Sequence, residues 1–257
     1  MAALPLHEEA AGWYLYGVVP SGAEAPRAAA VDPRHEVVAV REGPVAGLAS
    51  RVSLDEFDEA ALAERLADAQ WLEEKIRSHE QVLESALATS AVVPCRFCTV
   101  YRDESALRRF LSDRAGALSG ALARVEGRVE LGVKAFAVPE SSGDEASQAE
   151  SGRAYLEARR RERQAREELA QSRAQLAGEL HQRLRDAAED GVLLDLQSRE
   201  ASGRDADMIF NGAYLVAEGE RFRAVLAAAS RDHGGLDLEL TGPWPPYNFV
   251  PVELASA

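Results

Sequence analysis

The chain of 257 residues has only two cysteines, and its apolar residues never form a run long enough to span a bilayer. Two cysteines cannot build a disulfide framework, so we expect the protein in the reducing cytoplasm. The first residues lack both a basic flank and a sustained apolar stretch. This predicts that they are not a secretory signal.

Positive charge is also scarce, because 29 lysines and arginines stand against 43 aspartates and glutamates, a net charge of −14 at pH 7. Proteins that bind a phosphate backbone or an anionic bilayer need a basic surface. We therefore predict that the partners include neither nucleic acid nor a lipid membrane.

Sequence motifs of catalysis are missing as well. The chain has no Walker loop, no dinucleotide-binding glycine pattern, no nucleophile elbow and no H-E-x-x-H motif. Its five histidines are scattered singly, without a serine or cysteine pattern that points to them. These absences predict a protein that is not an enzyme and has no cofactor.

The composition that remains is typical of a globular protein, with 46% apolar and 28% charged residues. From Val129 to Ala137, apolar residues recur with a period of two, which predicts a strand. A polar loop at 141–152 precedes a long helix that reaches about Ala188. The first half of this helix, 157–168, has almost no apolar residue, so we expect an exposed arm or a surface for a partner. The later elements are strands at 192–197, 207–216 and 236–240, and a helix at 218–232 that ends at His233, Gly234 and Gly235.

The first half predicts a strand at 13–19 and a hairpin that pairs 36–40 with 45–51. A capping box of Ser53 and Glu56 predicts the start of a helix. A short strand at 92–94 and a second helix, capped by Asp103, follow. The first helix has one apolar stripe of about 30 residues, made of Leu62, Leu66, Ala69, Leu72, Ile76, Leu83 and Leu87.

From Val129, the order strand, helix, strand, strand, helix, strand is that of the split βαβ, or ferredoxin-like, arrangement. In this arrangement an antiparallel sheet has two helices on one face. The first half resembles a decorated version of the same arrangement. We therefore predict an α+β protein with two ferredoxin-like domains, residues 1–126 and 127–243, and a C-terminal tail rich in proline and aromatic residues at 244–257.

Cys95 and Cys98 form a C-x-x-C pair, which occurs in dithiol redox sites and in zinc sites. The next predicted helix starts near Asp103, too far along the chain for its N-terminus to lower the thiol pKa of Cys95. A zinc site needs two more ligands, and the sequence has no second C-x-x-C and no histidine pair. A thiol-disulfide or metal-binding activity at Cys95 and Cys98 is therefore the alternative hypothesis, and two small half-buried residues are the simpler interpretation.

The segment 241–252 combines prolines with aromatic residues directly after the last predicted strand. Proline fixes φ and has no N–H group, so this segment cannot continue as a central strand. We expect it to leave the sheet and to press its rings against the protein's own sheet edge or against a partner; both interpretations stay open. The predicted partner-binding residues are Thr241, Gly242, Pro243, Trp244, Pro245, Pro246, Tyr247 and Phe249, together with Arg96 in the stretch 92–101.

Six stretches, spread over most of the chain, form a recognisable pattern: YLYGVV (14–19), VVPCRFCTVY (92–101), GVKAF (132–136), SGRAYL (151–156), FNGAYLV (210–216) and LTGPWPPYNFV (240–250). In this order they resemble the gas vesicle accessory proteins of the F/L type. The usual family stretch is similar to P-M-R-F-G-T-V, so Cys95 and Cys98 stand where methionine and glycine are typical. This departure weakens the thiol hypothesis further.

The resemblance implies a non-enzymatic role in building gas vesicles, the protein-walled flotation organelles of some prokaryotes, in the cytoplasm and at the vesicle. Members of the family look like two ferredoxin-like domains plus a tail, and they bind the small hydrophobic shell protein and other accessory proteins. We therefore expect an assembly factor or minor vesicle component that limits aggregation of the shell protein. A small-molecule-sensing module is a third hypothesis, since ferredoxin-like sheets often pair to form ligand sites.

Overall fold

The computed structural model describes residues 10–137, 152–217, 219–232 and 236–255. The chain forms two compact units, which we call unit 1 (residues 1–129 and 244–257) and unit 2 (residues 130–243). The segment from Trp244, which the sequence set apart as a tail, is counted with unit 1. The predicted loop at 141–152 (up to residue 151) and the predicted C-cap at 233–235 lie outside the described residues.

Unit 1 contains a sheet with the order β2-β3-β1-β4, in which β5 also pairs with β1. This is the strand order of the split βαβ arrangement, but a loop replaces the helix that normally connects the first two strands. The strands of unit 1 are β1 (Ala11–Pro20), β2 (Val38–Glu42), β3 (Val45–Ser53), β4 (Val93–Pro94) and β5 (Val100–Tyr101). The hairpin of β2 and β3 is antiparallel, as predicted.

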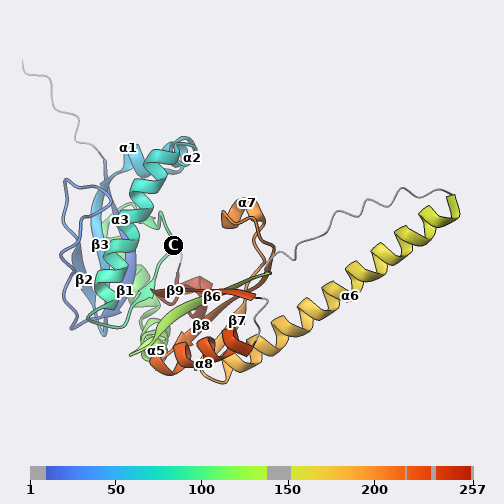
Figure 1. Cartoon of the computed structure of the whole chain (residues 1–257). Helices are drawn as coiled ribbons and strands as arrows, with labels where there is room; N and C mark the ends of the chain where they lie inside the picture. Colours follow the sequence, from blue (N-terminus) through green and yellow to red (C-terminus); the bar gives the residue numbers. More distant parts are fainter. Residues whose placement is uncertain (1–9, 138–151, 218, 233–235, 256–257) are drawn as a thin grey trace, which may run out of the picture. The chain divides into compact units, whose positions relative to one another are not determined.

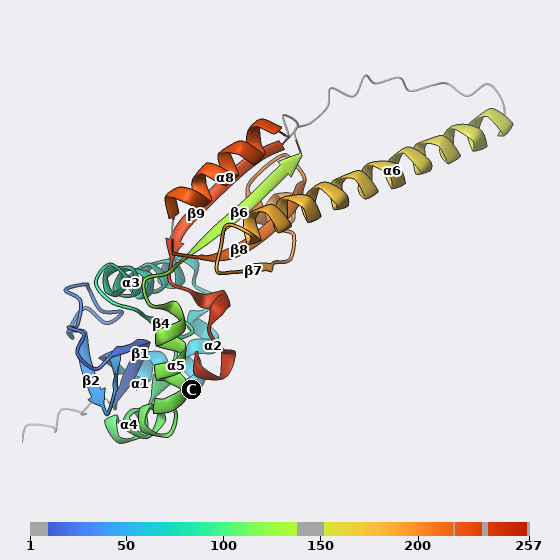
Figure 2. The same ribbon diagram turned by 90° about the horizontal axis from the view of Figure 1, so that it is seen from below.

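Helices cover both faces of this sheet, whereas the sequence predicted helices on one face only. Figure 2 shows α3 (Ala69–Leu87) and α4 (Glu104–Asp113) on opposite sides of β1. Tyr14 of β1 lies against α3, and the neighbouring Leu15 lies on the other face, because side chains alternate along a strand. A Cβ atom at Gly47 would lie 2.9 Å from Cδ1 of Leu15 and 3.3 Å from Cδ1 of Leu111, so glycine lets α4 approach β3 closely. The second layer explains why eight consecutive residues of β1 are buried.

The predicted capping box is wrong. Ser53 makes no side-chain bond to the short helix α1 (Leu54–Phe57), and Glu56 instead accepts a hydrogen bond from Nε1 of Trp71, at 2.7 Å. The predicted single helix is divided, because Asp58 and Asp68 each cap a new helix, α2 (Glu59–Arg65) and α3. In the same way, Asp103 caps α4 as predicted, but α5 (Ala115–Val125) is a separate helix.

Unit 2 has the predicted split βαβ arrangement, with the strand order β7-β8-β6-β9. Figure 1 shows α6 and α8 on the same face of this sheet. The short helix α7 was not predicted. The strand β9 is longer than predicted, because Gly242 and Pro243 remain in it. Proline is tolerated there since β9 is an edge strand. The elements of unit 2 are β6 (Val129–Ala137), α6 (Gly152–Arg185), β7 (Asp190–Leu193), α7 (Arg199–Ser202), β8 (Met208–Val216), α8 (Gly219–Asp232) and β9 (Leu236–Trp244).

Only the last turns of α6 contact the sheet. Leu180 and Leu184 are buried, whereas the described side chains from 156 to 172 are all exposed. The charged residues of this arm form ion pairs one turn apart, such as Arg163 with Glu167 at 2.9 Å. Exposed pairs of this kind stabilise a helix only slightly. The sequence prediction of an exposed first half is thus confirmed.

Candidate protein-docking site

Most of the C-terminal segment lies against unit 1 and contributes to its core. Pro245, Pro246, Phe249 and Leu254 are buried, the last two in the short 3-10 helices η1 (Tyr247–Phe249) and η2 (Val252–Leu254). The backbone N–H of Arg96 donates a hydrogen bond to the carbonyl oxygen of Ala255, at 2.6 Å. The segment therefore packs on its own chain, as one of the two interpretations of the sequence had it.

The structure distributes the predicted partner-binding residues over three environments. Thr241 is half-buried on β9, with its hydroxyl 3.5 Å from the carbonyl oxygen of Gly132. Pro245, Pro246 and Phe249 are buried, and Tyr247 is half-buried. The residues that remain exposed, and so accessible to a partner, are Gly242, Pro243, Trp244 and Arg96. That any of these residues contacts a partner stays a prediction.

A chain of hydrogen bonds fixes Tyr247 to unit 1. The N–H of Cys98 donates to the hydroxyl of Tyr14 at 3.0 Å, so the Tyr14 hydroxyl can donate to Nδ1 of His79, 2.9 Å away. His79 then has its proton on Nε2, which lies 3.3 Å from the hydroxyl of Tyr247. That hydroxyl donates in turn to a carboxylate oxygen of Glu80, at 2.8 Å. The stretch 92–101 and the C-terminal segment, about 150 residues apart in sequence, meet at these groups.

Burial controls the ionisation of this network. It lowers the pKa of His79 to about 4, so the imidazole is neutral at pH 7. Burial also raises the pKa of Glu80, against the hydrogen bond from Tyr247, which lowers it. The pKa of Tyr247 is raised by burial and by the neighbouring carboxylate of Glu80. Because His79 is buried and satisfied by its partners, its role is to hold the fold, and it is not a candidate base.

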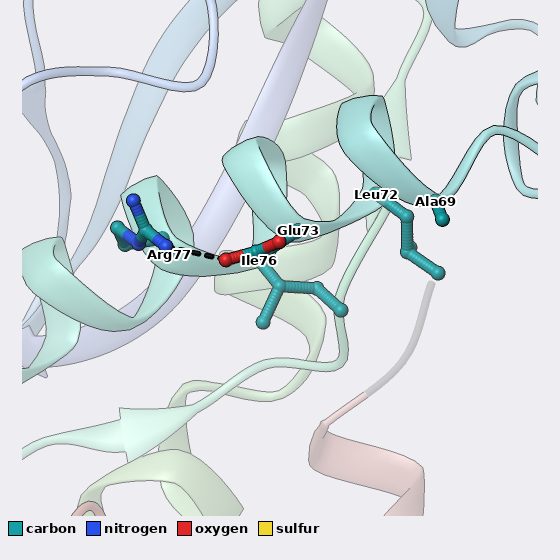
Figure 3. A pocket seen from close by; sticks show the side chains of 5 residues that line it. All are labelled: Ala69, Leu72, Glu73, Ile76 and Arg77. Carbon is teal, nitrogen blue, oxygen red and sulfur yellow. Dashed lines mark hydrogen bonds and ion pairs between the residues drawn. The ribbon is translucent and has the colours of Figure 1, made fainter.

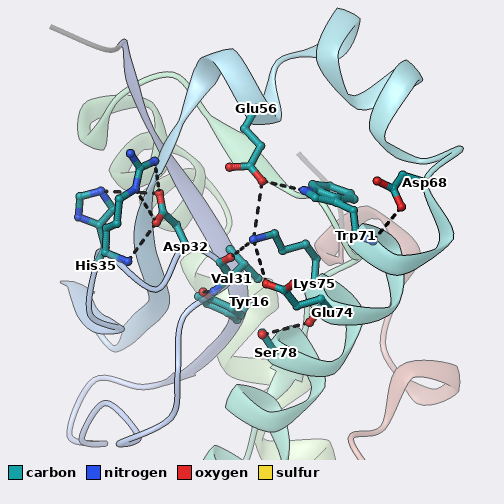
Figure 4. Close-up of polar contacts among 11 residues, drawn as sticks. Tyr16, Val31, Asp32, His35, Glu56, Asp68, Trp71, Glu74, Lys75 and Ser78 are labelled. Carbon is teal, nitrogen blue, oxygen red and sulfur yellow. Dashed lines mark hydrogen bonds and ion pairs between the residues drawn. The ribbon is translucent and has the colours of Figure 1, made fainter.

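A second polar network lies nearer the N-terminus of α3 and attaches the loop between β1 and β2 (Figure 4). Nζ of Lys75 is buried and donates to the carbonyl oxygen of Val31 at 2.7 Å, with carboxylate oxygens of Glu56 and Glu74 at 3.7 and 3.6 Å. The N–H of Val31 donates to the hydroxyl of Tyr16 at 2.9 Å. The buried face of α3 is thus polar in part, because it satisfies the backbone of the loop that replaces a helix.

Because polar residues occupy part of the buried face of α3, some apolar residues of this helix face the solvent. The core-facing residues are Trp71, Lys75, His79, Val82, Leu83 and Ala86. The predicted apolar stripe was therefore only partly a core stripe: Leu83 of α3 is buried, but Ile76 of α3 and Leu66 at the end of α2 are 40% and 47% exposed. Sequence analysis missed this because lysine and histidine are seldom buried.

The outward residues form a shallow groove of about 400 Å³ along α3, lined by Ala69, Leu72, Glu73, Ile76 and Arg77. Figure 3 shows Leu72 and Ile76 on the same side of the helix. Glu73 and Arg77 form an ion pair at its rim. A groove with apolar walls and a charged rim can bind an apolar side chain or helix of another protein.

The two thiols do not form a reactive site. Cys95 is fully buried, and burial raises the pKa of each thiol to about 12, which leaves almost no thiolate at pH 7. Cys98 has a φ of 63°, a left-handed conformation that glycine adopts more easily. In the described part of the chain, no group of three or more histidine, cysteine, aspartate and glutamate side chains could hold a metal ion. No observation supports the thiol or metal alternative.

None of the helices in the described ranges is both apolar enough and long enough to cross a membrane. The family model for the gas vesicle synthesis protein GvpL/GvpF matches residues 12–251. Gas vesicle protein L of a Streptomyces strain is 36% identical over 222 residues, which cover 83% of this chain and 82% of the relative. Gas vesicle protein F2 of Halobacterium salinarum is 27% identical over 70% of each chain. The crystal structure of the gas vesicle protein GvpF from Anabaena sp. superposes with a TM-score of 0.70 at 18% identity and covers 94% of this chain and 96% of that one, so it has the same fold.

Proposed function

This chain belongs to the GvpL/GvpF family of gas vesicle synthesis proteins, and we propose that it is a non-enzymatic assembly factor that binds the hydrophobic shell protein. In this proposal it acts in the cytoplasm and at the vesicle, also contacts other accessory proteins, and limits aggregation of the shell protein before it is assembled.

The groove on α3 is the observation that carries the proposal. The exposed Ile76 and the half-buried Leu72, together with Ala69, form a continuous apolar surface on a chain with a net charge of −14. Continuous apolar surface on an otherwise charged protein marks a site of interaction. The ion pair of Glu73 and Arg77 at the rim is a polar border of the kind that surrounds such sites.

The charge of the chain fits the same role. A small apolar subunit with free strand edges aggregates when its apolar surface is exposed during assembly. Binding in the groove would cover part of that surface. The excess of carboxylates would keep the complex dispersed, since a net charge far from zero opposes association.

The test is co-expression of the shell protein with the wild type or with the variant Ile76→Asp. The variant places a charge in the groove at an exposed position, so the fold is kept while the apolar contact is lost. We expect the amount of co-purified and soluble shell protein to fall at least about tenfold. Leu169→Asp, an exposed leucine of the α6 arm, is the matched control and should have no effect. Equal recovery with Ile76→Asp and wild type would refute the role of the groove.

A contact between the C-terminal segment and the shell protein cannot be tested by truncating the chain. Removing the chain from Gly242 would delete the buried Phe249 and Leu254 and so unfold unit 1. Trp244→Ala is suitable because this ring is exposed. Reduced capture of the shell protein by Trp244→Ala would identify Trp244 as a contact, and unchanged capture would assign the segment to the fold alone.

A further inference from the structure

The two edges of the sheet in unit 2 differ in how they are protected. The strand order β7-β8-β6-β9 makes β7 and β9 the edges. On β9, Pro243 removes one N–H donor, and Arg204 forms ion pairs with Asp237 at 3.0 Å and Glu239 at 3.1 Å. Proline and charged side chains on an edge strand are known obstacles to pairing with another strand.

The β7 edge is extended and pairs with a strand of the described sheet on one side only. Asp190–Leu193 pairs antiparallel with β8, and the N–H of Leu194 donates to the carbonyl oxygen of Asn211 at 2.9 Å. The side chain of Asn211 then donates to the carbonyl oxygen of Asp195 at 2.8 Å. Residues 190–195 therefore follow β8 in extended form, and none of the strands in the described ranges lies on their outer side.

Three leucines make this edge apolar: Leu193, Leu194 and Leu196 are 60%, 37% and 57% exposed. Leu193 is two residues from Gly191, which pairs with Tyr214, so both lie on the face of the sheet that α6 covers. Leu194 lies on the opposite face. A segment with exposed leucines on both faces, and with no strand of the described sheet on its outer side, is a template for a further strand.

We propose that the β7 edge binds an extended segment of another protein, which adds a strand to the sheet of unit 2. The segment has apolar residues on both of its faces, where they cover the three leucines, and basic residues at its ends. It uses none of the residues that line the groove on α3.

Charge selects the occupant. Residues 186–200 carry five carboxylates and one arginine, a net charge of −4. A second copy of this chain would place the same negative segment within the strand spacing of about 5 Å, which is unfavourable. A partner strand flanked by lysine or arginine instead neutralises these carboxylates and is attracted to them.

The test uses the full chain and a fluorescein-labelled synthetic peptide of alternating valine and isoleucine with arginine at both ends. We expect binding in fluorescence anisotropy and slower amide hydrogen exchange at residues 190–197. The variant Leu193→Ser/Leu196→Ser should weaken binding at least about tenfold, because it removes the apolar contact and keeps the backbone. The matched control is Leu156→Ser/Leu169→Ser, two leucines of the α6 arm that are 61% and 49% exposed, and it should bind as the wild type does.

Four outcomes would overturn the proposal: no binding of the peptide, protection outside residues 190–197, an equal loss in the control, or equal binding of a peptide with glutamate at both ends. A dimer of the wild type that Leu193→Ser/Leu196→Ser dissociates would also overturn it, since the occupant would then be a second copy. Ile76→Asp should leave peptide binding unchanged, so that failure of this proposal and failure of the groove on α3 are seen separately.

Discussion

Acid should destabilise unit 1 through His79. The pKa of this histidine is lowered from 6.5 to about 4 by burial, so the folded protein favours the neutral imidazole. A lowered pKa contributes stability that is fully present above pH 6.5 and is lost as the pH falls towards 4. Between pH 7 and about pH 4.5, linkage gives a loss of roughly 2 kcal/mol in the free energy of unfolding.

Urea unfolding followed by tryptophan fluorescence measures this loss. The chain has three tryptophans. Trp13 and Trp71 lie in unit 1, and Trp244, at the end of β9, is counted with it, so the signal reports mainly that unit. Glu80 also titrates in this pH range and acts in the opposite direction, because its pKa is raised by burial and its protonation in acid favours the fold.

Comparison with the variant His79→Gln separates the contributions of His79 and Glu80 to the pH dependence of stability. Glutamine can still form hydrogen bonds but does not titrate, so the variant keeps the contribution of Glu80 and loses that of His79. We expect the wild type to be more stable than the variant at pH 7, and this advantage to shrink by roughly 2 kcal/mol at about pH 4.5. The reasoning is refuted if the difference between the two proteins is the same at both pH values.

Three further predictions concern stability and are checked by the same urea unfolding at pH 7, or by circular dichroism for unit 2. Tyr247→Phe should lower the free energy of unfolding by about 1–3 kcal/mol, because it leaves Nε2 of the buried His79 without its hydroxyl partner; no change would contradict the network. Cys98→Gly should raise the free energy of unfolding by up to about 1 kcal/mol, since glycine adopts the left-handed conformation at lower cost; a loss would mean that packing of the thiol outweighs the backbone. Leu184→Ala should cost about 2–5 kcal/mol and Leu169→Ala less than about 0.5 kcal/mol, because only the first is buried; similar losses would contradict an exposed arm.

The α+β fold class and the split βαβ order of unit 2 could be predicted because the periodicity changes clearly from strand to helix. Val129, Leu131 and Val133 alternate with polar residues or glycine, and the strand they predict is β6. The last strand was predicted too short, since Gly242 and Pro243 were interpreted as its end. Proline excludes only a central strand, and β9 is an edge.

The candidate docking site, the groove on α3, could not be predicted from the sequence. Periodicity identifies an apolar face, but it does not decide whether that face meets the core or the solvent. On α3 the core face has Lys75 and His79, whose partners, Val31 and Tyr14, are brought there only by the tertiary fold. Aspartates at 58 and 68 were a local signal for the division of the helix, and they were overlooked beside the long apolar stripe.

Unit 1 is formed by residues that both precede and follow unit 2 in the sequence, since residues 244–257 complete it. During translation, the ribosome therefore makes Phe249 and Leu254 only after all of unit 2 has been synthesised. Until then Glu80 lacks its tyrosine partner, and the place of Phe249 in the core stays open. Unit 2 can fold as soon as its last strand emerges, whereas unit 1 is completed only when Phe249 and Leu254 have been made, so the N-terminal unit matures after the unit that follows it in the sequence.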